Sequence, residues 1–160
     1  MDDLTFRKAM GKFASGVTVI TTDLEDDVHG MTANAFMSLS LHPKLVVVSI
    51  DNRAHMLEKI RSSKKYAVNI LAEDQQILSM NFAGQLKENI DISFAILSGQ
   101  SVLEGAVAQV TCEVVNEHVE GDHALFIGKV TDIHIEDREP LLFYNGKYRS
   151  LKEEKVVETV

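Results

Sequence analysis

The feature that most constrains the fold is a pair of long strand-like runs joined by a short turn. Residues 108–119 and 123–135 are rich in β-branched side chains, and Glu120-Gly121-Asp122 between them is a typical turn. A further short run, residues 141–144, ends at the turn Asn145-Gly146. The second half of the chain is therefore predicted to be a meander of neighbouring strands.

The first half adds further strands and three helices. Strands are predicted over residues 17–22, from Val28 after the turn Glu25-Asp26-Asp27, over residues 44–50 with both faces buried, and over residues 66–71. Helices are predicted from a cap at Asp2 or Asp3 to Phe13, near residues 54–62 after a cap at Asn52, and from Glu73 into residues 81–84. The helices are too few for repeated βαβ units. The sequence therefore predicts a mostly β fold, an antiparallel sheet closed as a barrel with a few flanking helices.

The size and composition fit one domain. The chain has 160 residues, of which 45% are apolar, so it can build a core without disulfides. Its lone cysteine, Cys112, is expected to be a small core residue and favours a reducing, cytoplasmic location. We expect one domain over residues 1–151 and a surface tail over residues 152–160. No apolar run is long enough to span a membrane, and no export signal is expected.

The charge of the chain limits its partners. A net charge of −8 argues against a nucleic-acid or anionic membrane surface, since both require a basic patch. The charge is also divided unevenly. Residues 1–65 hold 9 Lys and Arg against 8 Asp and Glu, a net +1, whereas residues 66–160 hold 7 against 16, a net −9. An anionic ligand would therefore meet least repulsion in the first part of the chain.

Familiar catalytic motifs are missing from the sequence. It contains no Rossmann glycine motif, no phosphate-binding loop, no HExxH zinc motif and no GxSxG nucleophile elbow. The six histidines are scattered, so no metal site is expected. A Rossmann cofactor site, a P-loop nucleotide site, a zincin site and an α/β-hydrolase site are therefore not supported.

The most informative stretch, residues 29–40, is strand-like but rich in small and hydroxyl side chains. Small side chains allow a flat ligand to approach the backbone, whose N–H and C=O groups can bond the edge of a heterocycle. Ser38, Ser40 and Ser49 add neutral donors, while Asn52 and Arg53 lie at a predicted helix N-terminus. This combination suits a phosphorylated aromatic cofactor. The alternative is a polar strand facing solvent, with Arg53 as a surface charge.

Five segments together resemble the flavin reductase family. They are residues 29–40, residues 49–53, residues 66–71, Asn81-Phe82-Ala83-Gly84 and Gly121-Asp122-His123, in the family's order and spacing. The resemblance covers about Phe6 to Leu151. It is closest to the small reductase components of two-component phenol or 4-hydroxyphenylacetate monooxygenases from bacilli. The resemblance implies a homodimer with an FMN-binding split-barrel fold, which reduces FAD or FMN with NADH or NADPH.

The resemblance also implies roles for individual residues. It places the isoalloxazine ring against Thr32, Ala33 and Asn34, with Ser49 and Ile50 beside it. Ser38, Leu39, Ser40, Arg53 and Ala54 would lie along the ribityl and phosphate groups. Phe82, Ala83 and Gly84 would line the flavin site, either that of their own chain or that of the second chain across the dimer interface. His123 is similar to a histidine that contacts the nicotinamide, and Tyr148 resembles an aromatic residue near the cofactor.

Several of these residues have a simpler structural interpretation. Residues 82–84 are also typical of a helix C-terminus, with Phe82 in the core and Gly84 as a left-handed cap. His123 could be a turn histidine after Asp122, and Tyr148 could be a packing residue.

Three functions remain open at this point. The first is a reductase that passes reduced flavin by diffusion to an aromatic monooxygenase, with NADH slightly favoured by the acidic second half. The second is a flavin-binding electron-transfer protein of the same barrel without NADH turnover. The third is a barrel that binds a small ligand or a protein and no flavin.

Overall fold

The computed structural model describes residues 1–88 and 90–152 and is mostly β. Its elements, in chain order, are α1 (Asp3–Met10), β1 (Ser15–Gly16), β2 (Thr18–Leu24), β3 (Asp27–Ala33), β4 (Phe36–Ser40), β5 (Leu45–Asp51), α2 (His55–Ser63), β6 (Lys65–Ile70), the 3-10 helix η1 (Glu73–Gln75), α3 (Gln76–Phe82), β7 (Phe94–Leu97), β8 (Gln100–Leu103), β9 (Ala108–Glu120), β10 (His123–Ile135), β11 (Leu142–Tyr144) and β12 (Lys147–Arg149). Apart from Lys152, the predicted tail lies outside the described residues.

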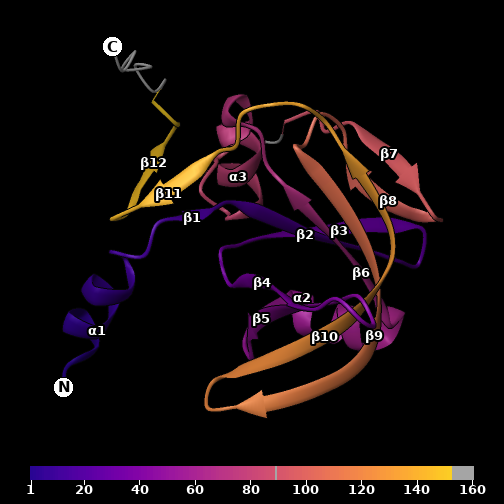
Figure 1. Ribbon diagram of the computed structural model, residues 1–160, viewed down its shortest axis with the longest axis horizontal. Coiled ribbons are helices and arrows are strands. Elements are labelled where there is room, and N and C mark those ends of the chain that lie inside the picture. Colours follow the sequence, from indigo (N-terminus) through magenta and orange to yellow (C-terminus); the bar gives the residue numbers. More distant parts are fainter. Residues whose placement is uncertain (89, 153–160) are drawn as a thin grey trace, which may run out of the picture.

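A curled seven-stranded sheet forms the body of the molecule (Figure 1). Its strand order is β3-β2-β6-β9-β10-β5-β4, and every pairing is antiparallel. The predicted mostly β, antiparallel fold is confirmed. The two edge strands meet at the corner where the chain passes from β3 to β4 through Asn34 and Ala35. No ladder joins these two strands within the described part of the chain, so the predicted closure into a barrel is not seen.

The hairpins follow from local turn chemistry. Glu25 and Asp26 have φ of 54° and 63°, and Asn145 and Gly146 have φ of 53° and 75°, as a two-residue hairpin turn requires. Both turns were predicted, as was the long β9–β10 hairpin. The β7–β8 hairpin was not predicted, because its two strands have only four residues each and its Ser98-Gly99 turn stands among irregular chain.

Two apolar clusters hold the sheet together. The larger lies inside the curl against α2 and includes Ile20, Tyr66 and Phe126, all fully buried. The smaller gathers Val17, Val19, Leu71, Leu103 and Leu141 beneath α3 and the C-terminal hairpin. Cys112 belongs to the larger cluster, and burial raises the pKa of its thiol to about 12. The predicted core role of this cysteine is confirmed.

Two predictions around β5 were wrong in detail. Val46, Val48 and Ile50 are buried, but the alternate residues of the strand, among them Val47 and Ser49, are only half-buried. One face of β5 is therefore open within a single chain. The expected cap at Asn52 is also absent, since α2 begins after Ala54 with no side-chain cap.

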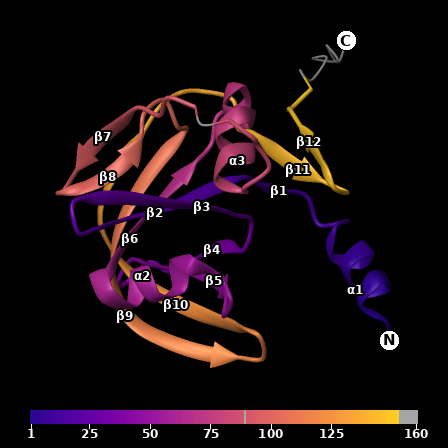
Figure 2. The same cartoon turned by 180° about the vertical axis from the view of Figure 1, so that it is seen from behind.

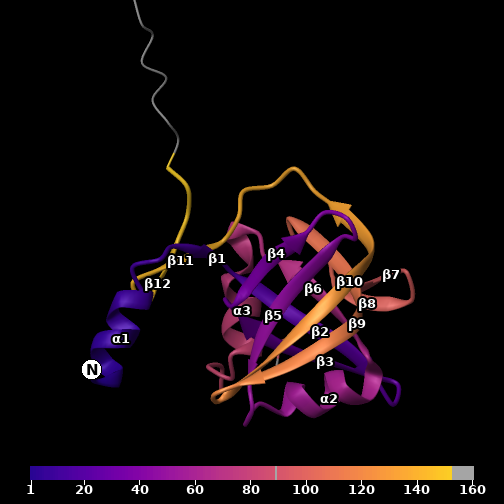
Figure 3. The ribbon, with the colours of Figure 1, turned by 60° about the horizontal axis from the view of Figure 1, so that its bottom comes forward.

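Helix α1 stands apart from the sheet, beside β11 and β12 (Figures 1 and 3). It is capped as predicted, because Asp2 Oδ1 accepts a hydrogen bond of 2.8 Å from the backbone N–H of Thr5. It ends at Met10 rather than Phe13, and none of its residues is buried. No helix in the described part of the chain has both the length and the apolar character needed to cross a membrane.

Candidate functional site

A cavity of about 390 Å³ lies at the corner between β3 and β4. Most of its lining side chains are small, and four of its residues were predicted site residues: Thr32, Asn34, Ala83 and Tyr148. The full lining is Val17, Thr32, Asn34, Ala35, Ser79, Ala83, Gln85, Phe143 and Tyr148. The stretch singled out by its small residues therefore does lie against an open space.

Hydrogen bonds fix the walls of this corner cavity. Thr32 Oγ1 donates to the backbone carbonyl of Ser79 at 2.6 Å, which ties β3 to α3. The hydroxyls of Ser79 and Tyr148 are 2.8 Å apart, and the Tyr148 ring meets Phe143 edge-on at 5.3 Å between ring centroids. Three segments far apart in the sequence thus form one rigid wall.

The backbone at the corner is well placed to bind the edge of a heterocycle. The carbonyl of Ala35 accepts a bond of 2.9 Å from the N–H of Ser49, which joins the corner to β5. Among the strands that the structure describes, β3 and β4 lie at the two edges of the sheet, so each offers a row of N–H and C=O groups to a ligand. A flat, polar ring can approach these groups because the neighbouring side chains are small.

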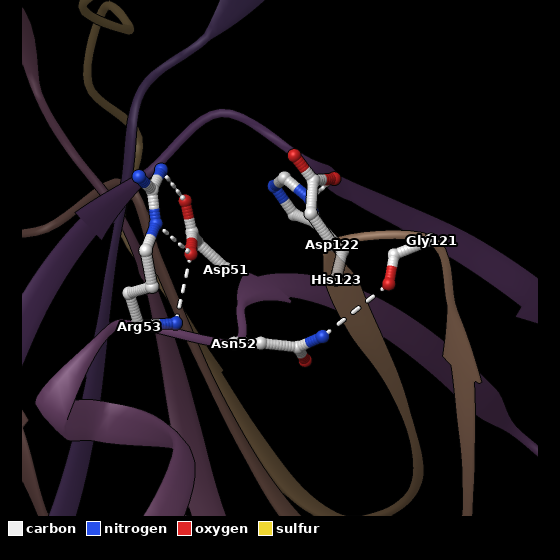
Figure 4. Close-up of polar contacts among 6 residues, drawn as sticks. All are labelled: Asp51, Asn52, Arg53, Gly121, Asp122 and His123. Carbon is white, nitrogen blue, oxygen red and sulfur yellow. Dashed lines mark hydrogen bonds and ion pairs between the residues drawn. The ribbon is translucent and has the colours of Figure 1, made fainter.

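A second group of predicted residues lies where β5 ends and β10 begins (Figure 4). His123 is directly opposite Asp51 in the β5–β10 ladder. Arg53 donates to Asp51 through Nη2 at 2.7 Å, Nε at 3.1 Å and its backbone N–H at 2.8 Å. The hydrogen bonds from Arg53 hold the pKa of Asp51 far below its usual value, and Asp51 in turn raises the pKa of Arg53. Arg53 is therefore a paired surface cation rather than a free one.

The loop before β10 holds His123 at the rim of the sheet (Figure 4). His123 Nδ1 is 2.7 Å from Asp122 Oδ1, and this hydrogen bond lowers the pKa of Asp122. The backbone N–H of Asn52 donates to the carbonyl of Asp122 at 2.9 Å. The side chain expected to cap α2 is also directed to this loop, because Asn52 Nδ2 donates to the carbonyl of Gly121 at 3.5 Å (Figure 4). The His123 side chain is 42% exposed, and Nε2 has no partner among residues 1–88 and 90–152. A ligand can reach this nitrogen.

The remaining predicted site residues vary in their access to a ligand. Ser38 and Leu39 are exposed on β4, Ser40 is half-buried, and Ala54 is half-buried at the start of α2. Ile50 is fully buried, so only its backbone could touch a cofactor. Ala33 is half-buried, with its carbonyl bonded to Thr18 Oγ1 at 2.5 Å.

The helix-end interpretation of residues 82–84 agrees with the structure. Phe82 packs against the smaller apolar cluster, and its ring fills the space that a Cβ at Gly30 would occupy. Gly84 follows the end of α3 with φ of 68°. Of the three residues, only Ala83 lines the corner cavity.

Sequence reasoning missed five of the lining residues: Val17, Ala35, Ser79, Gln85 and Phe143. Ala35 lies inside the small-residue stretch and could have been included on that ground. Ser79 carries no such signal, because its place in the wall depends on how α3 packs against β3.

The comparisons with known proteins agree with the predicted resemblance. Residues 10–152 match the family described as flavin reductase like domain. The chain is 49% identical over 152 residues to an NADH-dependent flavin reductase of a Rhodococcus species, covering 93% of this chain and 86% of that protein. It is 37% identical over 147 residues to the reductase component of 4-hydroxyphenylacetate 3-monooxygenase of Thermus thermophilus, covering 91% and 95% of the two chains.

Solved structures give the same result. The flavin reductase PheA2 in its native state superposes with a TM-score of 0.95 at 64% identity, over 96% of this chain and 100% of that chain. The styrene monooxygenase flavin reductase of Pseudomonas putida S12 superposes with a TM-score of 0.87 at 35% identity, over 93% and 98%. The chain therefore belongs to the flavin reductase like domain family.

Proposed function

We propose that this protein is an oxidoreductase that reduces FAD or FMN with NADH, or with NADPH, and delivers the reduced flavin by diffusion to an aromatic monooxygenase. The observation that carries the proposal is the corner cavity, where small side chains and open strand edges leave room for a flat, polar ring. The names of two relatives support it, since one is an NADH-dependent flavin reductase and the other a monooxygenase reductase component.

The proposed reaction needs no protein nucleophile. A bound flavin supplies the redox chemistry by accepting a hydride from the nicotinamide. The chain binds and orients both cofactors. Thr32, Ala33 and Asn34, with the backbone near Ser49, would hold the ring, and the wall formed by α3 and β12 would exclude water. Ser38, Leu39, Ser40 and Arg53 would lie along the ribityl and phosphate groups.

His123 is proposed as the residue that positions the nicotinamide. Its Nε2, which has no partner in the described part of the chain, lies at the rim, and Asp122 fixes the orientation of the ring. We expect His123→Ala to raise the KM for NADH about tenfold with a smaller change in kcat, because one hydrogen bond to the carboxamide is lost. Steady-state NADH oxidation with added FAD or FMN measures both parameters, and the exposed His118→Ala on the same hairpin is the control.

The same assay separates the alternative functions. If the wild-type protein binds flavin but oxidises no NADH, it is an electron-transfer protein. If added FAD shows no perturbed absorbance band in the presence of the protein, the chain has no flavin site. An unchanged KM for NADH in His123→Ala would remove this histidine from the site while leaving the reductase proposal standing.

Arg53 is expected to distinguish phosphorylated flavins from riboflavin. Arg53→Ala should weaken binding of FMN and FAD about tenfold and leave riboflavin binding unchanged, because only the first two carry phosphate. Fluorescence titrations with the three flavins measure the difference, and Lys8→Ala on α1 is the control. Equal effects on riboflavin and FMN would contradict the assignment and would indicate that Arg53 acts only through Asp51.

We further propose that residues 1–151 work as one cytoplasmic domain, an FMN-binding split barrel that forms a homodimer. Two surfaces that the single chain leaves open support the dimer. Helix α1 exposes Leu4, Phe6 and Met10, each more than half accessible, and one face of β5 is only half-buried. A second copy covering these surfaces would remove the apolar area from water.

The dimer predicts a clear effect of charge on α1. Phe6→Glu should shift the protein from dimer to monomer in sedimentation experiments, because a carboxylate would replace an aromatic ring in an apolar contact. Thr5→Glu, on the same helix, is the matched control and should leave the dimer intact. A wild-type protein that sediments as a monomer at all concentrations would exclude the dimer.

A further inference from the structure

A second cavity lies far from the corner cavity. It has a volume of about 430 Å³, within the range of small-molecule sites. The β7–β8 hairpin forms one wall, and the start of β9 with the end of β10 forms the other. The lining residues are Ala95, Ile96, Leu97, Val102, Glu104, Gly105, Gln109, His134 and Glu136. Figures 1 and 2 show β7 and β8 on the opposite side of the molecule from β11 and β12, which border the corner cavity.

Gln109, which lines this hairpin cavity, carries a buried hydrogen-bond acceptor that has no partner among the described residues. Gln109 is 3% exposed, and its Nε2 donates to the carbonyl of Leu103 at 2.8 Å. A carbonyl can only accept, so this bond fixes which end of the amide faces Leu103. Gln109 Oε1 is buried and bonded to nothing in the described part of the chain. A buried acceptor left in this state is unfavourable, so the cavity favours a molecule that donates a hydrogen bond.

The rest of the lining defines the kind of molecule. Ala95, Leu97 and Val102 share one face of the β7–β8 hairpin and form an apolar wall, which suits a compact hydrophobic body. Glu104 and Glu136 add negative charge. Carboxylates repel phosphate, so the hairpin cavity is unsuited to flavin or nicotinamide nucleotides.

His134 also belongs to the hairpin cavity and does not change this conclusion. It is directly opposite Gln109 in the β9–β10 ladder, so the two side chains share a face of the sheet. Its Nε2 lies 3.7 Å from Glu136 Oε1, so the imidazole is directed toward that carboxylate.

We propose that the hairpin cavity is a second ligand site, which binds a small uncharged molecule with an apolar body and one hydrogen-bond donor, of which a phenol is the simplest case. The donor would bond Gln109 Oε1 and the ring would pack against Ala95 and Val102, which are paired in the β7–β8 ladder. The site is separate from the proposed cofactor site. His123 begins β10 and His134 lies near its end, roughly 35 Å further along the strand.

The proposal does not depend on flavin chemistry and is tested by direct binding. Uniformly ¹⁵N-labelled protein is titrated with phenol and, in parallel, with fluorobenzene, which has a similar size but no donor. We expect phenol to shift the amide signals of Ile96, Gln109 and His134 and to bind about tenfold more tightly than fluorobenzene, as one hydrogen bond provides.

Two variants locate the binding. Ala95→Phe fills the cavity and should abolish the phenol shifts, whereas Val115→Phe at an exposed position of β9 should leave them unchanged. Gln109→Met keeps the size of the side chain but removes the acceptor, so phenol and fluorobenzene should then bind equally. Thermal denaturation confirms that each variant is folded.

Three results would overturn the proposal. The first is the absence of shifts at 10 mM phenol (roughly the upper limit for a specific weak ligand), which would mean that only an ordered water satisfies Gln109. The second is equal binding of phenol and fluorobenzene by the wild-type protein. The third is unchanged phenol binding in a folded Ala95→Phe variant.

Discussion

Replacing Asn69 by alanine is expected to lower the free energy of unfolding by about 3–5 kcal/mol. Asn69 is fully buried in β6 and makes three hydrogen bonds. Its Nδ2 donates to the carbonyl of Val19 at 2.9 Å and to Thr21 Oγ1 at 3.1 Å. Its Oδ1 accepts from the N–H of Leu103 at 2.7 Å. The alanine variant leaves all three groups buried without this partner, and equilibrium denaturation in urea measures the loss.

Asn116→Ala is the matched control for this prediction. Asn116 lies in β9 but is exposed, and among residues 1–88 and 90–152 its side chain bonds only the neighbouring N–H of Glu117. Its loss should change the unfolding free energy by less than about 0.5 kcal/mol. Equal effects of the two substitutions would mean that water replaces the bonds of Asn69 and that the β7–β8 hairpin is held by apolar packing alone.

Asn69 also illustrates which parts of the fold could be predicted from the sequence. The strands and most hairpins carry their own signals, because turns such as Asn145-Gly146 favour one backbone geometry. The placement of β8 does not, since Leu103 is held through its backbone by Asn69 on one side and Gln109 on the other. Two buried amides in separate strands have no recognisable spacing along the chain.

The residues of the candidate site also fall into two groups, those that the sequence predicts and those that only tertiary packing brings to the site. Thr32 and Asn34 could be identified because small residues in a strand indicate close approach of a ligand. Ser79 and Phe143 could not, because they reach the corner only through the packing of α3 and β11. The predicted cap at Asn52 was wrong, because α2 begins after Ala54 and the side-chain Nδ2 of Asn52 donates to the carbonyl of Gly121 instead. Tertiary partners of this kind replace local preferences.

The uneven distribution of charge along the chain favours binding of an anionic ligand less than the sequence counts imply. Arg53 contributes to the near-neutral first part, but its guanidinium is bonded to Asp51 in the same segment. A phosphate near Arg53 would therefore have to share this cation with a carboxylate. The exposed, acidic side chain of Asp122 lies close by and adds to the repulsion. Favourable binding of an anionic cofactor must then depend mainly on contacts to its ring. The corner cavity is therefore expected to provide most of the binding energy.

Ala35→Trp is expected to lower kcat/KM for flavin about 100-fold. Ala35 lines the corner cavity with an exposed side chain, and its carbonyl is bonded to Ser49. An indole at this position would occupy the space proposed for the isoalloxazine ring while leaving the backbone bond in place. The melting temperature should therefore change little. Steady-state turnover and flavin fluorescence titration should show the loss in binding rather than in the chemical step.

Ala95→Phe is the reciprocal control for Ala35→Trp, because each substitution fills one of the two cavities and leaves the other unchanged. It fills the hairpin cavity, so it should block phenol and leave flavin reduction unchanged, whereas Ala35→Trp should block flavin and leave phenol binding unchanged. Sedimentation of both variants checks that neither alters the oligomeric state. A folded Ala35→Trp variant with activity within about threefold of the wild type would exclude the corner cavity as the flavin site, because a ring of that size could not share the space with an indole.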